Sequence, residues 1–240
     1  MRSLEGLTVV MMGASGGMGS ATAKLIAKPG VNIAMCASRK ERLEQVAGEI
    51  AEKGANVYAS AVDISKVDQI EQFMSKVYER FGRVDILINF AGLSVTADID
   101  QLTEADYDKV MDVNVKGMYC STKSFVSRVN QEVGALIINF GSMAAKRPNP
   151  KAAHYSAAKV AVNMFTDALA QQLKSRNIRM TLINPGPTNT TFFEGRIPVE
   201  KRGDFMQAED VAELLEFIMT RNSSVNIHDV MLDSFSFFKK

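Results

Sequence analysis

The sequence predicts an α/β fold: a Rossmann-like doubly wound parallel sheet of about seven strands, with helices on both faces. Short apolar runs alternate with helical patterns along the whole chain, as they do in βαβ units. A glycine-rich turn, Gly13 to Gly19, directly follows the first apolar run. With 240 residues and 46% hydrophobic content the chain can bury a sizeable core, and no break in composition divides it. We therefore expect residues 1–240 to form a single domain.

Strands that are buried on both faces show as short continuous apolar runs. The expected strands are Thr8 to Met12, Val31 to Ala37, Val57 to Val62, Val84 to Asn89, Leu136 to Phe140, Met180 to Asn184 and, near the end, Asp229 to Leu232. Right-handed crossovers between them stack helices on both faces of the sheet. In such a fold the ligand crevice lies outside the carboxyl ends of the strands.

The glycine turn indicates a phosphate site. It leads from the first strand into a helical stretch, Ser20 to Lys28. Glycines let a phosphate approach the backbone closely, and the free amides of the following helix attract it. Glycine turns also open methyltransferase folds and ordinary tight turns, so the interpretation depends on the order of strand, glycines and helix.

The end of the second strand predicts which dinucleotide binds. Ser38 stands nineteen residues after Gly19, where a carboxylate would bind the ribose 2′-hydroxyl of NAD. Ser38, Arg39 and Lys40 instead offer a hydroxyl and two cations, which suit a 2′-phosphate. We therefore expect NADP (NADPH). The alternative is that Arg39 and Lys40 only begin a solvated helix, Lys40 to Lys53.

Tyr155, Lys159 and Ser142 indicate the chemistry. Tyr155 and Lys159 are four residues apart on an expected helix, so they share a face, and the ammonium is expected to lower the pKa of the phenol below its usual value of about 10. Ser142 follows the strand that ends at Phe140. The three groups are expected to meet at one carbonyl oxygen. The rival interpretation of Ser142 is a hydrolase nucleophile, but no Gly-x-Ser-x-Gly elbow is present and His154 is expected at the surface.

These motifs together resemble the short-chain dehydrogenase/reductase family, in its single-domain, NADP-preferring form, over nearly the whole chain. The family's glycine motif appears with Met12 in place of Thr, and its Asn-Asn-Ala-Gly motif appears as Asn89 to Gly92 with Phe90 in place of the second Asn. Packing is expected to replace the hydrogen bonds lost at Met12 and Phe90. The resemblance implies a catalytic set of Asn114, Ser142, Tyr155 and Lys159, in which Asn114 holds a water that connects Lys159 to solvent.

Motifs and resemblance together imply a set of cofactor-binding residues. They are Gly13, Ser15, Gly17, Met18, Gly19, Ser38, Arg39, Asp63, Ile64, Asn89, Ala91, Gly92, Tyr155, Lys159, Pro185, Gly186, Thr188 and Thr190.

The expected activity is NADPH-dependent interconversion of a small carbonyl compound (ketone, aldehyde or keto acid) and its alcohol, with Tyr155 as general acid/base. A catalytically idle NADP-binding sensor or scaffold and a 3-oxoacyl-[acyl-carrier-protein] reductase are the alternatives. Residues 188–206 are expected to cover the pocket as a lid. The candidate substrate residues are Ser142, Met143, Arg147, Phe192, Phe193 and Arg196, with Lys201 and Arg202 as further anion-binding candidates; alternatively, these charges only solvate a loop.

Composition and charge limit the kinds of partner that the protein is expected to bind. A formal net charge of +1 gives no reason to expect nucleic acid, and no apolar stretch reaches the roughly 18 residues of a membrane helix. No signal peptide is evident, so we expect a soluble cytoplasmic protein. With two His and no metal-ligand spacing, no metal site is expected, and Cys36 and Cys120 are interpreted as small buried residues.

A homodimer or homotetramer is expected from the last part of the chain. Phe235 to Phe238 would fray at a free terminus, so they are expected to dock on another subunit. Ala157, Ala158 and Ala161 are expected to allow close pairing of two helices.

Overall fold

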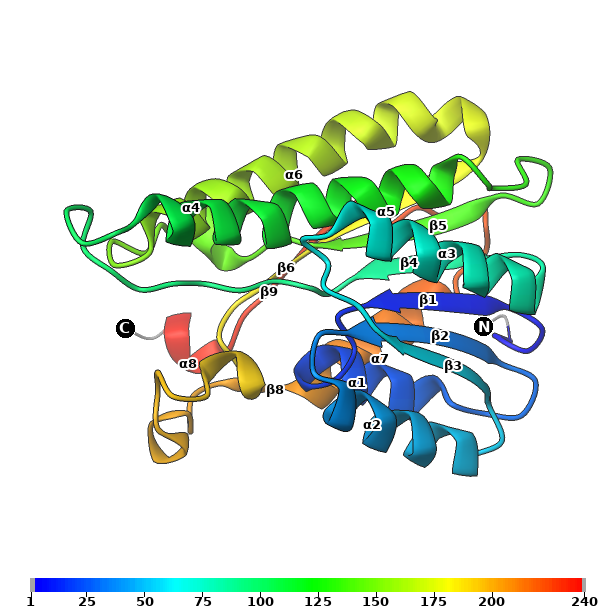
Figure 1. Cartoon of the computed structure of the whole chain (residues 1–240), viewed down its shortest axis with the longest axis horizontal. Helices are drawn as coiled ribbons and strands as arrows, with labels where there is room; N and C mark the ends of the chain where they lie inside the picture. Colours follow the sequence, from blue (N-terminus) through cyan, green and yellow to red (C-terminus); the bar gives the residue numbers. More distant parts are fainter. Residues whose placement is uncertain (1–2, 239–240) are drawn as a thin grey trace.

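The central sheet has seven parallel strands in the order β3-β2-β1-β4-β5-β6-β9. The structure is a computed structural model that describes residues 3–238 (Figure 1). The strands are β1 (Thr8–Met12), β2 (Asn32–Ala37), β3 (Asn56–Ala61), β4 (Ile86–Asn89), β5 (Ala135–Phe140), β6 (Ile178–Pro185) and β9 (Asp229–Leu232). The predicted fold class is confirmed, and all of the predicted strands are present.

Helices cover both faces of the sheet (Figure 1). One face carries α1 (Gly17–Ile26), α2 (Lys40–Glu52) and α7 (Ala208–Met219), and the other carries α3 (Val67–Phe81), α4 (Glu104–Met111), α5 (Gly117–Val126) and α6 (Ala153–Leu173). The short helix α8 (Phe235–Phe238) ends the described chain.

The alternation of side chains along β1 divides the core in two. Val9 and Met11 belong to the cluster beneath α1, α2 and α7, whereas Val10 and Met12 belong to the cluster beneath α3, α5 and α6. Successive side chains of a strand point to opposite faces, so a strand covered on both sides must be apolar throughout. All five residues of β1 are accordingly buried.

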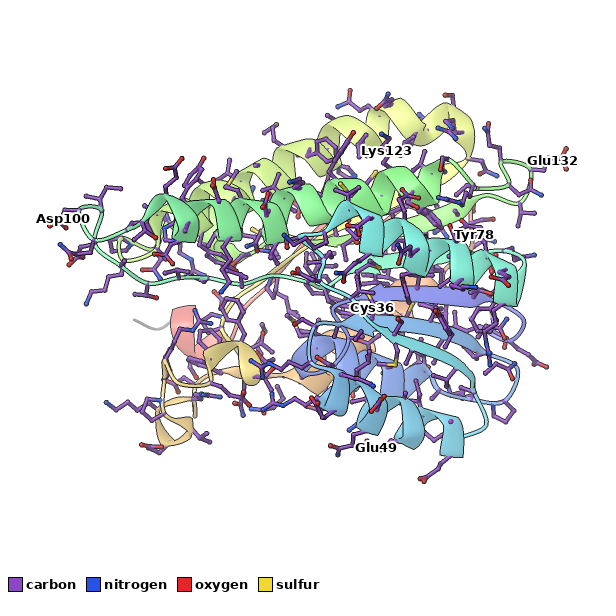
Figure 2. The ribbon with its side chains drawn as sticks, viewed as in Figure 1. Cys36, Glu49, Tyr78, Asp100, Lys123 and Glu132 are labelled. Atoms are coloured by element: carbon purple, nitrogen blue, oxygen red, sulfur yellow. The ribbon has the colours of Figure 1, made fainter. Side chains whose placement is uncertain are left out.

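The two apolar replacements in the family motifs are packed, as expected. The Met12 sulfur lies 3.6 Å from the Cys36 sulfur, and the Phe90 ring lies 4.8 Å from the Phe140 ring, centroid to centroid. Cys36 and Cys120 are both buried, which confirms their interpretation, and burial raises the pKa of the Cys36 thiol to about 12. Figure 2 shows Cys36 inside the molecule, while Asp100 and Glu132 mark loops at its opposite ends.

The segment expected to act as a lid, residues 188–206, is structured. It contains β7 (Thr188–Asn189), which pairs in parallel with β8 (Met206–Gln207), and 3-10 turns at Thr191–Phe193 and Val199–Lys201. Arg202, which is buried, donates hydrogen bonds to the carbonyl oxygens of Ile197 (2.9 Å), Phe193 (2.9 Å) and Thr190 (3.3 Å). Arg202 thus braces the segment from inside, and it does not face an anionic substrate as the sequence suggested.

Two surface expectations are wrong. His154 is buried, because α4 packs against α6 and covers its first turn. Ala158 is also buried, so it cannot take part in a contact between subunits, whereas Ala157 is exposed and Ala161 half-buried. Phe235 is exposed, and the side chains of Phe237 and Phe238 lie outside the described part of the chain.

Candidate active site

A cleft of about 1290 Å³ lies at the carboxyl ends of the strands. It receives Gly13 after β1, Ser38 after β2, Asp63 after β3, Ser142 after β5 and Pro185 at the end of β6. Apart from Asn89, every cofactor candidate of the sequence lines this cleft; the substrate candidates Ser142, Met143, Arg147, Phe192, Phe193 and Arg196 line it too, whereas Lys201 and Arg202 do not. The side chain of Asn89 points into the core instead, where it donates to Asn139 Oδ1 at 2.8 Å.

The glycine turn forms a tight cradle at the start of α1. Gly13 has a φ of +94°, and a Cβ on it would lie 2.7 Å from the Ala91 backbone. Gly17 has a φ of +53°, and a Cβ there would lie 2.8 Å from Thr190 of the lid. Only glycine tolerates both conditions. The amino end of α1 and this exposed backbone fit the pyrophosphate of a dinucleotide.

The cations at the far end of the cleft differ from those predicted. Arg39, the residue before α2, lines the cleft as expected, but its partner there is Arg42 in the first turn of α2. Lys40 points elsewhere and pairs with Glu44 at 3.7 Å. Arg39 and Arg42 both bind Glu194 of the lid, at 3.3 Å and 3.1 Å. Helical periodicity of α2 could have identified Arg42; nothing in the local sequence indicated Glu194.

Tyr155 and Lys159 lie on one face of α6 as predicted, but their electrostatics differ from the prediction. The Lys159 ammonium lies 5.7 Å from the centre of the Tyr155 ring and donates to the Phe140 carbonyl oxygen at 2.8 Å. Burial raises the pKa of the Tyr155 phenol, although a hydrogen bond with Ser142 acts in the opposite direction. Burial also lowers the pKa of Lys159 to about 8. The expected acidification of the phenol by Lys159 is therefore wrong for this state, because desolvation is the larger effect.

Asn114 sits in a π-helical turn, Asp112–Lys116, between α4 and α5. Its Nδ2 donates to the carbonyl oxygens of Leu93 (2.8 Å) and Val110 (2.9 Å), whereas its buried Oδ1 has no partner among the described residues. A Cβ on Gly92 would lie 2.9 Å from this Oδ1 and 3.3 Å from Lys159 Nζ, so both groups flank Gly92. A buried acceptor without a protein partner suits a bound water, as the resemblance implies.

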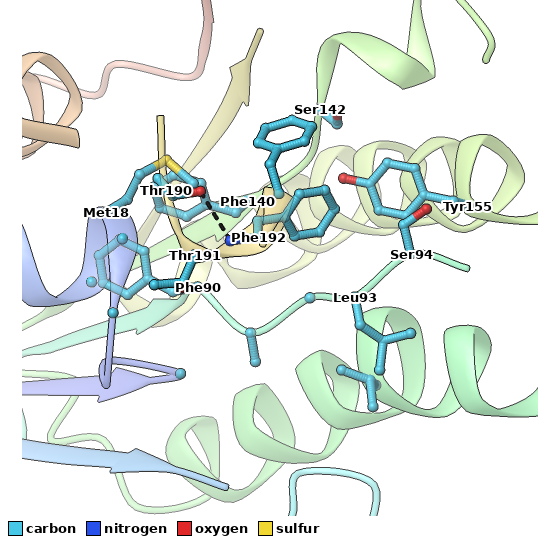
Figure 3. A pocket seen from close by; sticks show the side chains of 18 of the residues that line it. Met18, Phe90, Leu93, Ser94, Phe140, Ser142, Tyr155, Thr190, Thr191 and Phe192 are labelled. Carbon is cyan, nitrogen blue, oxygen red and sulfur yellow. Dashed lines mark hydrogen bonds between the residues drawn. The ribbon is translucent and has the colours of Figure 1, made fainter. Parts of the chain in front are cut away.

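Aromatic rings form the wall of the cleft opposite α6. The Phe192 ring lies 5.8 Å from the Tyr155 ring, and Figure 3 shows the two rings and Ser142 around one space. The Arg196 guanidinium lies 4.2 Å from the centre of Phe192 and donates to the Phe192 carbonyl oxygen. Arg147 lines the same space and is ion-paired with Asp233. Ser94, which also lines the cleft (Figure 3), was missed by the sequence analysis.

Other kinds of site find little support. His154 does not line the cleft, so Ser142 has no histidine base there. Within residues 3–238 no group of three or more His, Cys, Asp or Glu side chains is arranged to hold a metal ion. In the same part of the chain, no helix combines the length and apolar character that crossing a bilayer requires.

The comparisons with known proteins agree with this geometry. A family model described as short chain dehydrogenase matches residues 7–200. The chain belongs to the short-chain dehydrogenase family. It is therefore an oxidoreductase that acts on CH–OH and C=O groups.

The relatives of this short-chain dehydrogenase align along nearly its whole length. An uncharacterized oxidoreductase of Staphylococcus saprophyticus is 31% identical and aligns over 96% of this chain and 98% of its own. The structure of an alcohol dehydrogenase from Thermococcus sibiricus, complexed with 5-hydroxy-NADP, is 28% identical with a TM-score of 0.88, covering 95% of this chain and 97% of that one. A 3-ketoacyl-(acyl-carrier-protein) reductase from Brucella melitensis, complexed with NADH, is 30% identical with a TM-score of 0.87, covering 96% and 97%.

Proposed function

We propose that this short-chain dehydrogenase is an NADPH-dependent enzyme that interconverts a small ketone, aldehyde or keto acid and its alcohol. The observation that carries the proposal is the cleft that joins the glycine cradle, the Arg39 and Arg42 pair, and the Tyr155, Ser142 and Lys159 group. Residues 1–240 would act as one domain, with 188–206 as the lid over the reacting groups.

The cofactor assignment rests on the charges at the adenosine end of the cleft. The Arg39 and Arg42 guanidiniums suit a 2′-phosphate, which carries a charge of about −2. Asp63 and Ile64 would hold the adenine, the glycine cradle the pyrophosphate, and Lys159 the nicotinamide ribose. NADPH, when bound, supplies the hydride for carbonyl reduction. The NADP-type ligand in the related alcohol dehydrogenase supports this choice, and the NADH in the related reductase makes the arginines the deciding feature.

In the reductive direction Tyr155 donates its phenolic proton to the carbonyl oxygen as negative charge develops there. The raised pKa keeps the phenol protonated before reaction. Ser142 holds the same oxygen by a hydrogen bond, which lowers the energy of the developing oxyanion. Lys159 stabilises the tyrosinate that forms and passes it a proton, and a water on Asn114 Oδ1 would then return a proton from solvent to Lys159. In the oxidative direction Tyr155 acts as the base.

A turnover assay distinguishes the proposed activity from two alternatives. An idle NADP-binding sensor or scaffold would bind NADPH without turnover, and an acyl-carrier-protein reductase would need a thioester substrate. Wild-type protein is incubated with NADPH and a panel of small ketones, aldehydes, keto acids and a 3-oxoacyl thioester, while absorbance of the reduced nicotinamide is followed. Turnover of a small carbonyl supports the proposal, and turnover of the thioester alone, or of nothing while NADPH binds, rejects it.

We also propose that the protein is a cytoplasmic homodimer or homotetramer. Several large apolar side chains on α4, α5 and α6 are exposed, namely Tyr107, Tyr119, Val160 and Met164. Contact between subunits would remove them from water. Light scattering at micromolar concentration tests the assembly, and a monomeric mass would reject it.

A further inference from the structure

Glu194 occupies the anion site at the adenosine end of the cleft. Its carboxylate lies 3.1 Å from Arg42 Nη1 through Oε2 and 3.4 Å through Oε1, and 3.3 Å from Arg39 Nη1. All three side chains line the cleft. Arg39 is the N-cap of α2 and Arg42 lies in its first turn, whereas Glu194 comes from the lid, more than 150 positions away along the chain.

The position of Glu194 is built into the lid. It directly follows the 3-10 turn Thr191–Phe193, which is capped by Thr190: the Phe192 N–H donates to Thr190 Oγ1 at 3.3 Å. The amide of Glu194 donates to the Thr191 carbonyl oxygen at 3.1 Å, and Arg202 holds the neighbouring Phe193 carbonyl oxygen at 2.9 Å. The backbone on which Glu194 stands is therefore anchored independently of its two ion pairs.

The charge on Glu194 opposes a phosphate at the same place. The hydrogen bond from Arg42 holds the pKa of the Glu194 carboxyl below its usual value, with Arg39 acting in the same sense, so Glu194 is ionised at neutral pH. A 2′-phosphate needs the guanidinium N–H groups that now serve Glu194, and it would bring a charge of about −2 against the carboxylate. A cofactor that carries a 2′-hydroxyl instead brings no such charge.

We propose that Glu194 is a cofactor-selectivity residue: its carboxylate holds the Arg39 and Arg42 site until a 2′-phosphate displaces it, so the lid reports which dinucleotide is bound. This inference rests on the proposed function, since it takes Arg39 and Arg42 as the 2′-phosphate site. Glu194 moderates the preference for NADP(H) over NAD(H), because binding of the phosphate must break two ion pairs. Its neighbour Phe192 faces Tyr155 and carries Arg196 on its ring, so displacement of Glu194 acts on the segment that covers the reacting groups.

The size of the effect follows from the exposure of the cluster. The side chains of Arg39, Arg42 and Glu194 are 55%, 43% and 44% exposed, so each pair is partly screened by water. Exposed ion pairs typically change an equilibrium constant by up to about fivefold each. Removal of the carboxylate charge should therefore tighten NADPH binding by about 3- to 10-fold and leave NADH within about twofold.

The experiment measures NADPH and NADH dissociation constants of the full-length protein by fluorescence of the reduced nicotinamide. Glu194→Gln keeps the size of the side chain and removes its charge, and Glu200→Gln is the matched control, because Glu200 lies in the same lid but does not line the cleft. The proposal expects tighter NADPH binding in Glu194→Gln only. In an Arg42→Ala background the same substitution should give a smaller gain, since one of the two pairs is already absent.

The outcomes separate this inference from the proposed function. Wild-type protein that binds neither cofactor, or that prefers NADH, rejects the proposed function. Wild-type preference for NADPH together with unchanged binding in Glu194→Gln rejects the role of Glu194 alone. Weaker NADH binding in Glu194→Gln also rejects it, because Glu194 would then be a ligand of the ribose hydroxyls and not a competitor of the phosphate.

Discussion

The Lys159 ammonium donates to the Phe140 carbonyl oxygen, 2.8 Å away at the end of the neighbouring strand β5. This bond fixes the cation between the sheet and α6, where it lies 5.7 Å from the centre of the Tyr155 ring. Lys159 is therefore held in a buried position at the edge of the cleft. Its bond to β5 and its place on α6 set the distance at which its charge acts on Tyr155.

Tyr155→Phe should abolish turnover while NADPH affinity stays within about twofold, because the phenol supplies the proton and the rest of the cleft holds the cofactor. General acid catalysis of this kind contributes about 10²- to 10⁴-fold to kcat. Steady-state kinetics and cofactor fluorescence measure both quantities. Tyr119→Phe, on the exposed surface of α5, is the control and should retain full activity. Undiminished kcat in Tyr155→Phe would remove Tyr155 from the mechanism.

The pKa of Lys159, lowered to about 8 by burial, makes stability depend on pH. Between about pH 8 and 10.5 the unfolded chain binds more protons at this lysine than the folded one, so the free energy of unfolding rises with pH. Measured in urea at pH 7.5 and 9.5, it should rise by about 1 to 2 kcal/mol more in wild type than in Lys159→Met. Lys123→Met, at an exposed site, should show no such difference from wild type. Equal pH dependence in wild type and Lys159→Met would mean that Lys159 is not desolvated.

Arg42→Ala should weaken NADPH binding by about 1 to 3 kcal/mol, as should Arg39→Ala, since each removes a charged hydrogen bond to the 2′-phosphate. NADH binding should stay nearly unchanged. Lys40→Ala is the matched control, because Lys40 is adjacent in sequence but does not line the cleft. Isothermal titration with both cofactors makes the comparison. An equal loss of NADPH affinity in Lys40→Ala would show that the effect is general electrostatic attraction.

Arg196→Met should raise KM for keto acids by about tenfold and leave KM for neutral ketones within about twofold, given the strength of a hydrogen bond to a charged group. Arg196 is the lid cation that faces Tyr155, and among the described residues no carboxylate pairs with it. Lys201→Met, in the same lid outside the cleft lining, is the control. Parallel increases in KM for acids and neutral ketones would indicate damage to the aromatic wall instead of a lost charge.

Much of the fold and of the site could be predicted because local patterns determine them. Apolar runs identify buried strands, and the ends of those strands bring Gly13, Ser38 and Ser142 to one edge of the sheet. The spacing of Tyr155 and Lys159 places both on one face of α6. In each case the information lies within a few consecutive residues.

The errors concern contacts between distant segments. The burial of His154 depends on α4, and the pairing of Glu194 with Arg42 depends on the path of the lid. The raised pKa of Tyr155 reflects desolvation by everything packed around it, which spacing along a helix does not report. Such properties depend on how elements are assembled, so a single sequence without its fold does not determine them.

One stretch of seven residues, Thr190 to Arg196, meets three parts of the cleft: its start abuts the glycine cradle, Phe192 faces Tyr155, and Glu194 reaches Arg42 of α2. Grafting this heptapeptide from a homologue would therefore transplant coenzyme choice and ligand choice together. Engineers who wish to alter one trait without the other must substitute single positions inside it.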